Sequence, residues 1–424
     1  MNVQRTSAYL VILTVILVSV LSRTLAQATQ LPRDLTQLDW QEQGETLLAL
    51  GSQYDGQWGL WAFDANLNIQ RQISLDGYKV VKWSPDGARF SIDRDIIDAT
   101  TFKVILTLEK AGSGIGYWSQ DGSQVLAWAN AEQTELGLFD SQTGELIRQI
   151  LIKGRPDSIS WSPNNAYLLL VQASGETEVI SATDGHLIST LDTEFASGLS
   201  WSPDSQYLAG GITTSVTANT PGRLPDSASP RVASVVVWDA LTGKTVRSFS
   251  PLPDFFRIVR WHPFKPIIVA GSPRSLIYVW DVQLGEQLEA FTLKEELRDL
   301  SFSPFGGRIT ASVFPVTNQQ DQQLAQEQRG FPQGLYWSEN FADNRLQTIV
   351  IDPSLEKLSE IESVCLPSSA RSSLAIADIL VDDADNSSLN TYIEVVQTDP
   401  AIPKGCAADL IAVAEALQDE QESR

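Results

Sequence analysis

Side chains that could support catalysis are sparse in this sequence. Its 424 residues include only two histidines, His186 in a turn and His262 after a predicted strand. A metal site built from several histidines, or a Ser–His–Asp relay, therefore has no supporting pattern. The 52 acidic residues are too numerous to single out a pair. An enzyme that uses two carboxylates, as glycosidases do, thus stays open.

The two cysteines, Cys365 and Cys406, lie near the C-terminus and are 41 positions apart. In an exported chain, two isolated cysteines usually form one disulfide. Closing a loop of this length would stabilise the fold by about 4 kcal/mol on the chain-entropy model. A metal pair is disfavoured because no histidine lies nearby. We therefore predict a Cys365–Cys406 disulfide.

One segment carries oxygen ligands at the spacing of a calcium loop. Asp383, Asp385, Ser387 and Glu394 stand at positions 1, 3, 5 and 12 of the EF-hand pattern. Ser388 stands where that pattern has its turn glycine. The alternative is a helix that begins with a serine cap, which the same composition explains. Calcium is therefore a secondary hypothesis, and no other cofactor is predicted.

The strands that would position the side chains named above belong to a sequence repeat with a period of about 40 residues. Each of seven segments opens with a β-prone run that ends in an aromatic residue and a turn, as in Val-Lys-Trp-Ser-Pro-Asp-Gly at 81–87. Proline followed by Asp, Asn or Gly favours a tight turn, so a strand should end at each aromatic. These aromatics are Trp40, Trp83, Trp118, Trp161, Trp201, Trp261 and Phe302.

Each segment later contains a second apolar run that stops at a small polar residue. These residues are Asp64, Asp98, Asp140, Ser181, Asp239, Asp281 and Asp352. We call the run that ends at the aromatic strand a, the run after the first turn strand b, the run that ends at the small polar residue strand c, and the run that follows it strand d. Each segment therefore has four strands. One such unit cannot bury both faces of its sheet, so the units should close radially. The sequence predicts an all-β, seven-bladed β-propeller of four-stranded antiparallel blades over 29–363, with repeats starting near 36, 79, 114, 157, 197, 256 and 298.

The Trp-Ser-Pro-Asp turns and the Val-Trp-Asp strand end at 237–239 resemble the WD-repeat family, over about residues 36–363. The resemblance implies a rigid propeller whose strand-a and strand-c tryptophans are core. The repeats are degenerate, because the family's Gly-His pair before strand a is missing. Similar Trp-Ser-Pro-Asp-Gly turns occur in Tol-type periplasmic propellers, which are alternative relatives.

Two repeats are long between strands b and c, around 216–231 and 315–345. In propellers that this chain resembles, b–c loops emerge on the same face as the d–a loops, which we call the insertion face. Loops on a rigid scaffold commonly carry function, and aromatic residues with arginine are typical of binding hot spots. The alternative is that 335–341 prolongs strand b and packs locally. The predicted binding residues are Arg223, Arg231, Arg329, Phe331, Tyr336 and Trp337.

The two ends of the chain differ in character from the repeats. Residues 1–28 combine Arg5, an apolar run too short to span a bilayer and a small-residue cleavage pattern, which indicates a signal peptide. An uncut membrane anchor is the alternative. Residues 364–424 are predicted to form a helical tail with the disulfide, in two helices separated by Pro400 and Pro403. The apolar residues at helical spacing are Leu389, Tyr392, Ile393, Val396, Leu410, Val413, Ala414 and Leu417.

Charge and targeting together define the expected setting. The formal charge is −22, and it becomes −24 when the signal with its two arginines is removed. Such a surface repels nucleic acid and anionic lipid. We expect a monomer with no membrane span after signal cleavage, located in the periplasm, at the cell surface or outside the cell.

The leading functional hypothesis is an exported, non-catalytic scaffold that binds a protein or a cell-surface polymer. The first rival hypothesis is a secreted enzyme. It would be either a hydrolase with carboxylates at the mouth of the central channel or a quinone-dependent dehydrogenase, because segments 140–144 and 239–243 resemble the blade turns of such dehydrogenases. The second rival hypothesis is a calcium-dependent assembly factor. Acidic side chains converging on the channel mouth would favour the enzyme, whereas exposed aromatics there would favour binding.

Overall fold

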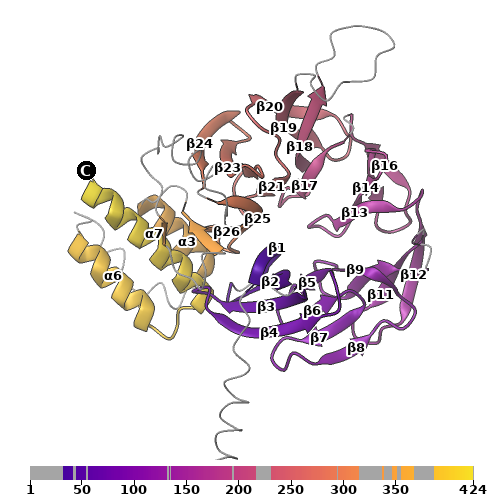
Figure 1. The fold of residues 1–424 in the computed structure, drawn as a ribbon, viewed down its shortest axis with the longest axis horizontal. Coiled ribbons are helices and arrows are strands. Elements are labelled where there is room, and N and C mark those ends of the chain that lie inside the picture. Colours follow the sequence, from indigo (N-terminus) through magenta and orange to yellow (C-terminus); the bar gives the residue numbers. More distant parts are fainter. Residues whose placement is uncertain are drawn as a thin grey trace, which may run out of the picture.

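The computed structural model describes residues 32–423 except 42–43, 54–55, 131–132, 134, 193–194, 216–230, 294, 315–336, 339–345, 351–354 and 367–385. The strands form seven four-stranded sheets, and paired neighbours run antiparallel. Figure 1 shows the sheets arranged around a common centre, with the C-terminal helices gathered outside the ring on one side. The fold is therefore a β-propeller with a short C-terminal helical region.

Six sheets are regular blades, in which the four strands follow one another in chain order from the centre outwards. The first contains β1 (Pro32–Trp40), β2 (Thr46–Gln53), β3 (Trp58–Asp64) and β4 (Ile69–Leu75). The second contains β5 (Val81–Trp83), β6 (Arg89–Ile92), β7 (Asp95–Asp98) and β8 (Val104–Thr107). The third contains β9 (Gly112–Trp118), β10 (Gln124–Trp128), β11 (Glu135–Asp140) and β12 (Leu146–Leu151).

The remaining regular blades follow the same order. The fourth contains β13 (Pro156–Trp161), β14 (Tyr167–Gln172), β15 (Thr177–Ser181) and β16 (Leu187–Thr190). The fifth contains β17 (Ser197–Trp201), β18 (Tyr207–Ser215), β19 (Arg231–Asp239) and β20 (Thr245–Leu252). The sixth contains β21 (Ile258–Trp261), β22 (Ile267–Gly271), β23 (Leu276–Asp281) and β24 (Glu286–Thr292). Each strand a ends at its predicted aromatic, because the turn that follows stops the pairing.

The last sheet, which we call the irregular sheet, has a different order. It contains β25 (Glu296–Phe302), β26 (Ile309–Phe314), β28 (Leu346–Ile349) and β27 (Trp337–Ser338), in that spatial sequence. Its outer strand therefore precedes strand c in the chain, whereas the outer strand of a regular blade follows it. The prediction of seven blades of one kind was wrong in this respect. Six sheets are regular blades, whereas the outer strand of the seventh sheet is formed by two residues of the insertion, Trp337 and Ser338.

The Ser-Pro-Asp turns, and the Ser-Gln-Asp turn of the third blade, contain local hydrogen bonds from serine to aspartate. In the third blade, the Ser119 hydroxyl donates to Asp121 Oδ1 at 2.6 Å, and the same oxygen accepts the Ser123 backbone N–H at 3.0 Å. The Gln124 N–H donates in turn to Ser119 Oγ at 3.0 Å. The serine and aspartate side chains of this turn thus find partners within six residues, which favours a turn, and the end of a strand, at this motif.

The core lies between neighbouring sheets, and in several blades the strand-a aromatic is covered by the first residue of strand b in the preceding sheet. Tyr207 stacks on Trp261 with ring centroids 6.5 Å apart. At the equivalent position of the second blade, the Arg89 guanidinium lies 4.9 Å from the Trp118 ring centroid. Eight of the nine repeat tryptophans are buried as predicted, and Trp161 is partly buried.

The C-terminal region packs as a small helical unit made of α3 (Leu355–Cys365), α6 (Asn386–Thr398) and α7 (Lys404–Ser423). The two predicted helices are confirmed as α6 and α7, and the residues at helical spacing, such as Leu389, Tyr392 and Leu410, are fully buried. The predicted disulfide joins Cys365 at the end of α3 to Cys406 in α7. The sequence did not predict α3.

Candidate functional site

The predicted insertion face is only partly described. Ser215 at the end of β18 pairs with Arg231 at the start of β19, and β26 ends shortly before the second insertion, so both insertions leave the ends of second strands. Trp337 lies in β27 and pairs with Ile349. The other predicted binding residues, Arg223, Arg329, Phe331 and Tyr336, lie outside the described residues. Binding at this face therefore stays a prediction.

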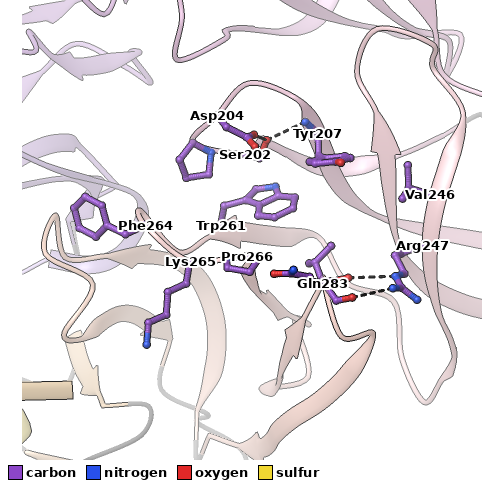
Figure 2. A pocket seen from close by; sticks show the side chains of 12 residues that line it. Ser202, Asp204, Tyr207, Val246, Arg247, Trp261, Phe264, Lys265, Pro266 and Gln283 are labelled. Atoms are coloured by element: carbon purple, nitrogen blue, oxygen red, sulfur yellow. Dashed lines mark hydrogen bonds between the residues drawn. The ribbon is translucent and has the colours of Figure 1, made fainter. Parts of the chain in front are cut away.

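The hollows found in the described residues lie at the opposite strand ends, where the a–b and c–d turns meet. We call this side the turn face. The first hollow, which we call the inter-blade pocket, is a cavity of about 550 Å³ between the fifth and sixth blades. Figure 2 shows Trp261 at its centre, with Tyr207 on one side and Phe264 on the other. The Trp261 Nε1 donates to the Ser200 carbonyl at 3.1 Å, so the indole offers the pocket mainly its carbon surface.

The rim of the inter-blade pocket combines exposed apolar side chains with two cations, Arg247 and Lys265, each held by its own partners. Phe264 and Val246 are about half exposed. The Arg247 guanidinium donates to the backbone carbonyls of Val282 and Gln283 at 3.2 and 2.9 Å, as Figure 2 shows. Equivalent arginines brace other blades, since Arg148 donates to a carbonyl of the next blade in the same way. The bracing role of Arg247 is therefore structural, and the apolar surface is the distinctive feature of the pocket.

The second hollow, which we call the channel-mouth hollow, is a cavity of about 400 Å³ where the inner strands of the first four blades end. Four tryptophans line it, namely Trp40, Trp83, Trp118 and Trp161. Ser84 and Gln120, from the turns that follow two of these tryptophans, also line it, and four further lining residues directly precede the tryptophans in the sequence. They are Asp39, Lys82, Tyr117 and Ser160.

The charged pair of the channel-mouth hollow is tightly held. The Lys82 ammonium lies 3.0 Å from Asp39 Oδ1, and the Trp83 backbone N–H donates to Asp39 Oδ2 at 2.8 Å. Burial is the largest single influence on the pKa of Lys82 and lowers it, but the charge of Asp39, its hydrogen bond and the nearby Tyr117 together outweigh burial, so the net pKa lies above its ordinary value. Burial raises the pKa of the Tyr117 phenol, which therefore stays protonated and can donate a hydrogen bond.

A second carboxylate on the inner strands is equally occupied. Asp299 Oδ1 accepts hydrogen bonds from Arg260 at 2.7 Å and from the Leu300 N–H at 2.9 Å, while Oδ2 accepts the Leu38 N–H at 2.9 Å. A glycosidase-type mechanism needs one carboxyl group that can hold and release a proton. Asp39 and Asp299 are each held by one cation and by backbone N–H groups.

The calcium hypothesis falls mostly on undescribed residues. Asp383 and Asp385 lie outside the described part of the chain, whereas Ser387 and Glu394 both belong to helix α6. Within the residues that the structure describes, no group of three or more His, Cys, Asp or Glu side chains could hold a metal ion. Calcium binding therefore stays a prediction. The part of the proposed calcium loop that the structure describes is helical.

The residues of these two hollows were not predicted from the sequence as candidate site residues. A usable signal was present: the residue before each strand-a aromatic points to the channel in the first four blades, so Asp39, Lys82 and Tyr117 could have been grouped. The inter-blade pocket had a weaker signal. Phe264 stands where most turns have Asp or Asn, as Asp121 and Asn164 do.

Comparison with known proteins supports the fold and nothing finer. No protein-family model matches the chain, and no curated protein matches its sequence. Many solved structures match by fold, 1527 chains in all, so the architecture is too widespread to name a function. One is a chain of Kuenenia stuttgartiensis hydrazine synthase, with 14% identity and a TM-score of 0.54 over 68% of this chain and 96% of that one. This similarity identifies the chain as a β-propeller.

Proposed function

We propose that this protein is an exported binding scaffold, a degenerate WD-repeat-like propeller of seven blades that holds a protein or a cell-surface polymer. In this proposal the irregular sheet serves as the seventh blade. The turn face and the insertion face are the two candidate binding surfaces. The disulfide fits an oxidising compartment outside the cytoplasm. The part of the chain that the structure describes has no helix that is long and apolar enough to cross a membrane.

The observation that carries the proposal is the composition of the channel-mouth hollow. Tryptophan and tyrosine rings line it, while Asp39 is tied to Lys82 and to a backbone N–H. Aromatic surfaces with a few fixed polar groups are typical of recognition sites. The apolar rim of the inter-blade pocket extends the same character along the turn face.

The alternative proposal, a secreted enzyme, also places its site at the channel mouth. A hydrolase would need a carboxylate there that can exchange a proton, and Asp39 and Asp299 are both paired with cations. A quinone-dependent dehydrogenase has support only from the resemblance of two blade turns. The name of the solved hydrazine synthase describes that protein, and at 14% identity it does not extend to this chain. We therefore rank binding first.

The decisive experiment compares three variants of the secreted chain in cross-linking and pull-down from its native envelope. Val246→Asp with Phe264→Asp alters the inter-blade pocket, and Tyr117→Ala with Gln120→Lys alters the channel-mouth hollow. Deleting 318–330 with Trp337→Ala alters the insertion face. Leu151→Asp is the control, because Leu151 is 76% exposed and lines neither hollow.

Loss of one specific partner with a single face-directed variant, and its retention with Leu151→Asp, is the expected result. Equal recovery with all three variants would reject a binding role for both faces. Intact mass of the secreted chain tests export independently. A chain that begins near Thr29 is expected, and a chain that keeps residues 1–28 would instead indicate an uncut anchor.

A further inference from the structure

We infer that the C-terminal helical unit is a disulfide-locked clasp that holds the propeller ring closed between the irregular sheet and the first blade. The first blade uses residues 32–75, and the irregular sheet uses residues 296–349. Each of the two sheets that meet at this seam is thus built from one end of the propeller. Contacts across the seam include the Leu38 N–H to Asp299 Oδ2 at 2.9 Å and the Ser312 hydroxyl to the Leu35 carbonyl at 2.9 Å.

The a–b turn of the irregular sheet is completed by α7. Phe305 stands where the third blade has Asp121, so the turn lacks its own carboxylate. Asp409 from α7 supplies it: its Oδ2 accepts the Ser303 hydroxyl at 2.5 Å and the Gly307 N–H at 3.1 Å. Asp121 accepts the hydroxyl and N–H at the same two positions of its own turn. The helix thus provides a hydrogen-bonding group that the repeat has lost.

The same carboxylate reaches across the seam through Arg308. Asp409 Oδ1 lies 2.8 Å from Arg308 Nε, and both side chains are buried. The Arg308 guanidinium in turn lies 5.1 Å from the centroid of the Trp40 ring, at the end of the inner strand of the first blade. Asp409 therefore fixes the residue that covers the first blade's aromatic.

The helical unit touches the turns on both sides of the irregular sheet. A Cβ added to Gly44, in the a–b turn of the first blade, would lie 3.3 Å from Gly405 Cα in α7. On the other side, α3 reaches the sixth blade, where Lys265 Nζ lies 2.7 Å from Glu360 Oε2. The unit therefore spans three consecutive turns, and the seam lies beneath α7.

The disulfide is placed to control this contact. Cys406 lies three residues before Asp409 on α7, and Cys365 ends α3, which the chain enters directly from the irregular sheet. With the bond formed, α7 is tied to the last repeat close to the seam. A dithiol reductant converts the bond to two thiols and is itself oxidised to a cyclic disulfide. Reduction then leaves only non-covalent contacts to hold Asp409 in place.

Hydrogen–deuterium exchange on the full secreted chain tests the clasp, with and without dithiothreitol. Reduction should speed exchange about tenfold or more in β1, β25 and β26, while β13–β16 on the far side of the ring stay unchanged. Asp409→Asn should give the same local pattern without reductant, and Asp121→Asn is the matched control that removes a turn carboxylate far from the seam. If Asp409→Asn does not fold, reduction of the wild type still decides the matter. Unchanged exchange at the seam after complete reduction, or an equal rise in all sheets, would overturn the inference.

Discussion

The a–b turns of the third blade and the irregular sheet have the same hydrogen bonds but obtain them differently. In the third blade, Ser119 and Asp121 are two residues apart. In the irregular sheet, Ser303 bonds Asp409, which lies 106 residues further along the chain. The hydrogen bonds of Asp121 can form as soon as the residues of its own turn are in place, whereas those of Asp409 need the helical unit docked. The same set of hydrogen bonds is thus local in the third blade and tertiary in the irregular sheet.

The largest expected difference between a turn with its own aspartate and the turn completed by Asp409 concerns the arginine that follows the turn, which the second blade and the irregular sheet both have. Arg308→Met should lower the free energy of unfolding by about 3–5 kcal/mol, because it leaves the Asp409 carboxylate buried without its cation. Arg89→Met, at the equivalent position of the second blade, should cost about 1 kcal/mol, since Asp86 beside it is largely exposed. Chemical denaturation of both variants measures the contrast. Equal losses would mean that the helical unit adds nothing special to its turn.

A second contrast involves the turn of the sixth blade, where His262 Nδ1 accepts the N–H groups of Phe264 and Lys265 at 3.1 Å each. Burial, together with the nearby charges of Lys357 and Lys265, lowers the pKa of His262 to about 3. Below about pH 6.5, His262 therefore binds a proton in the unfolded chain but stays neutral in the folded protein. The free energy of unfolding consequently falls as the pH drops from about 6.5 towards 3.

This pH dependence should be specific to His262. Between pH 7 and pH 4, the wild type should lose about 3 kcal/mol more stability than His262→Gln. Thermal or urea unfolding across this pH range is the measurement, and His186→Gln is the control because His186 is exposed. An identical acid response in wild type and His262→Gln would contradict the assignment of a neutral, buried imidazole.

A smaller effect is expected in a self-contained turn. Asp121→Ala should cost about 1 kcal/mol, because the lost hydrogen bonds are partly exposed and water can replace them. Gln120→Ala, at the exposed neighbouring position, serves as the control for denaturant unfolding. A cost above that of Arg308→Met would reverse the proposed ranking of local and tertiary turns.

The smallest effect concerns the partly exposed ion pair between Lys265 and Glu360. Lys265→Ala should change stability by about 0.5 kcal/mol, and the change should vanish in high salt. Denaturant unfolding at two salt concentrations measures it. A salt-independent loss of several kcal/mol would show that this contact, rather than Asp409, anchors the helical unit.

The parts of the fold that could be predicted from the sequence are those set by local chemistry. Each inner strand ends at its predicted aromatic because the residues that follow form a tight turn. The helices α6 and α7 were predicted because their buried residues recur at helical spacing. The irregular sheet was not, because β27 is only two residues long and joins β28 through pairing that no short pattern encodes.

The candidate site could be predicted only in part, for a related reason. Asp39, Lys82 and Tyr117 occur at one repeat position, but their separation in sequence conceals that they line one hollow. The insertions attracted attention because they break the repeat, yet the described hollows lie on the turn face, where the repeat is most regular. A pocket formed between blades has no contiguous sequence signature.

The sequence by itself determined the turn motif, the four-stranded repeat, the two tail helices and the cysteine pair, because each depends on residues close in the chain or on residue type alone. Only the tertiary structure decided that Asp409 would complete a distant turn, that Arg308 would cover Trp40 and that two of the inner carboxylates would be paired with cations. These features depend on which surfaces meet when the ring closes, and contacts between distant segments are selected by packing rather than by local preference.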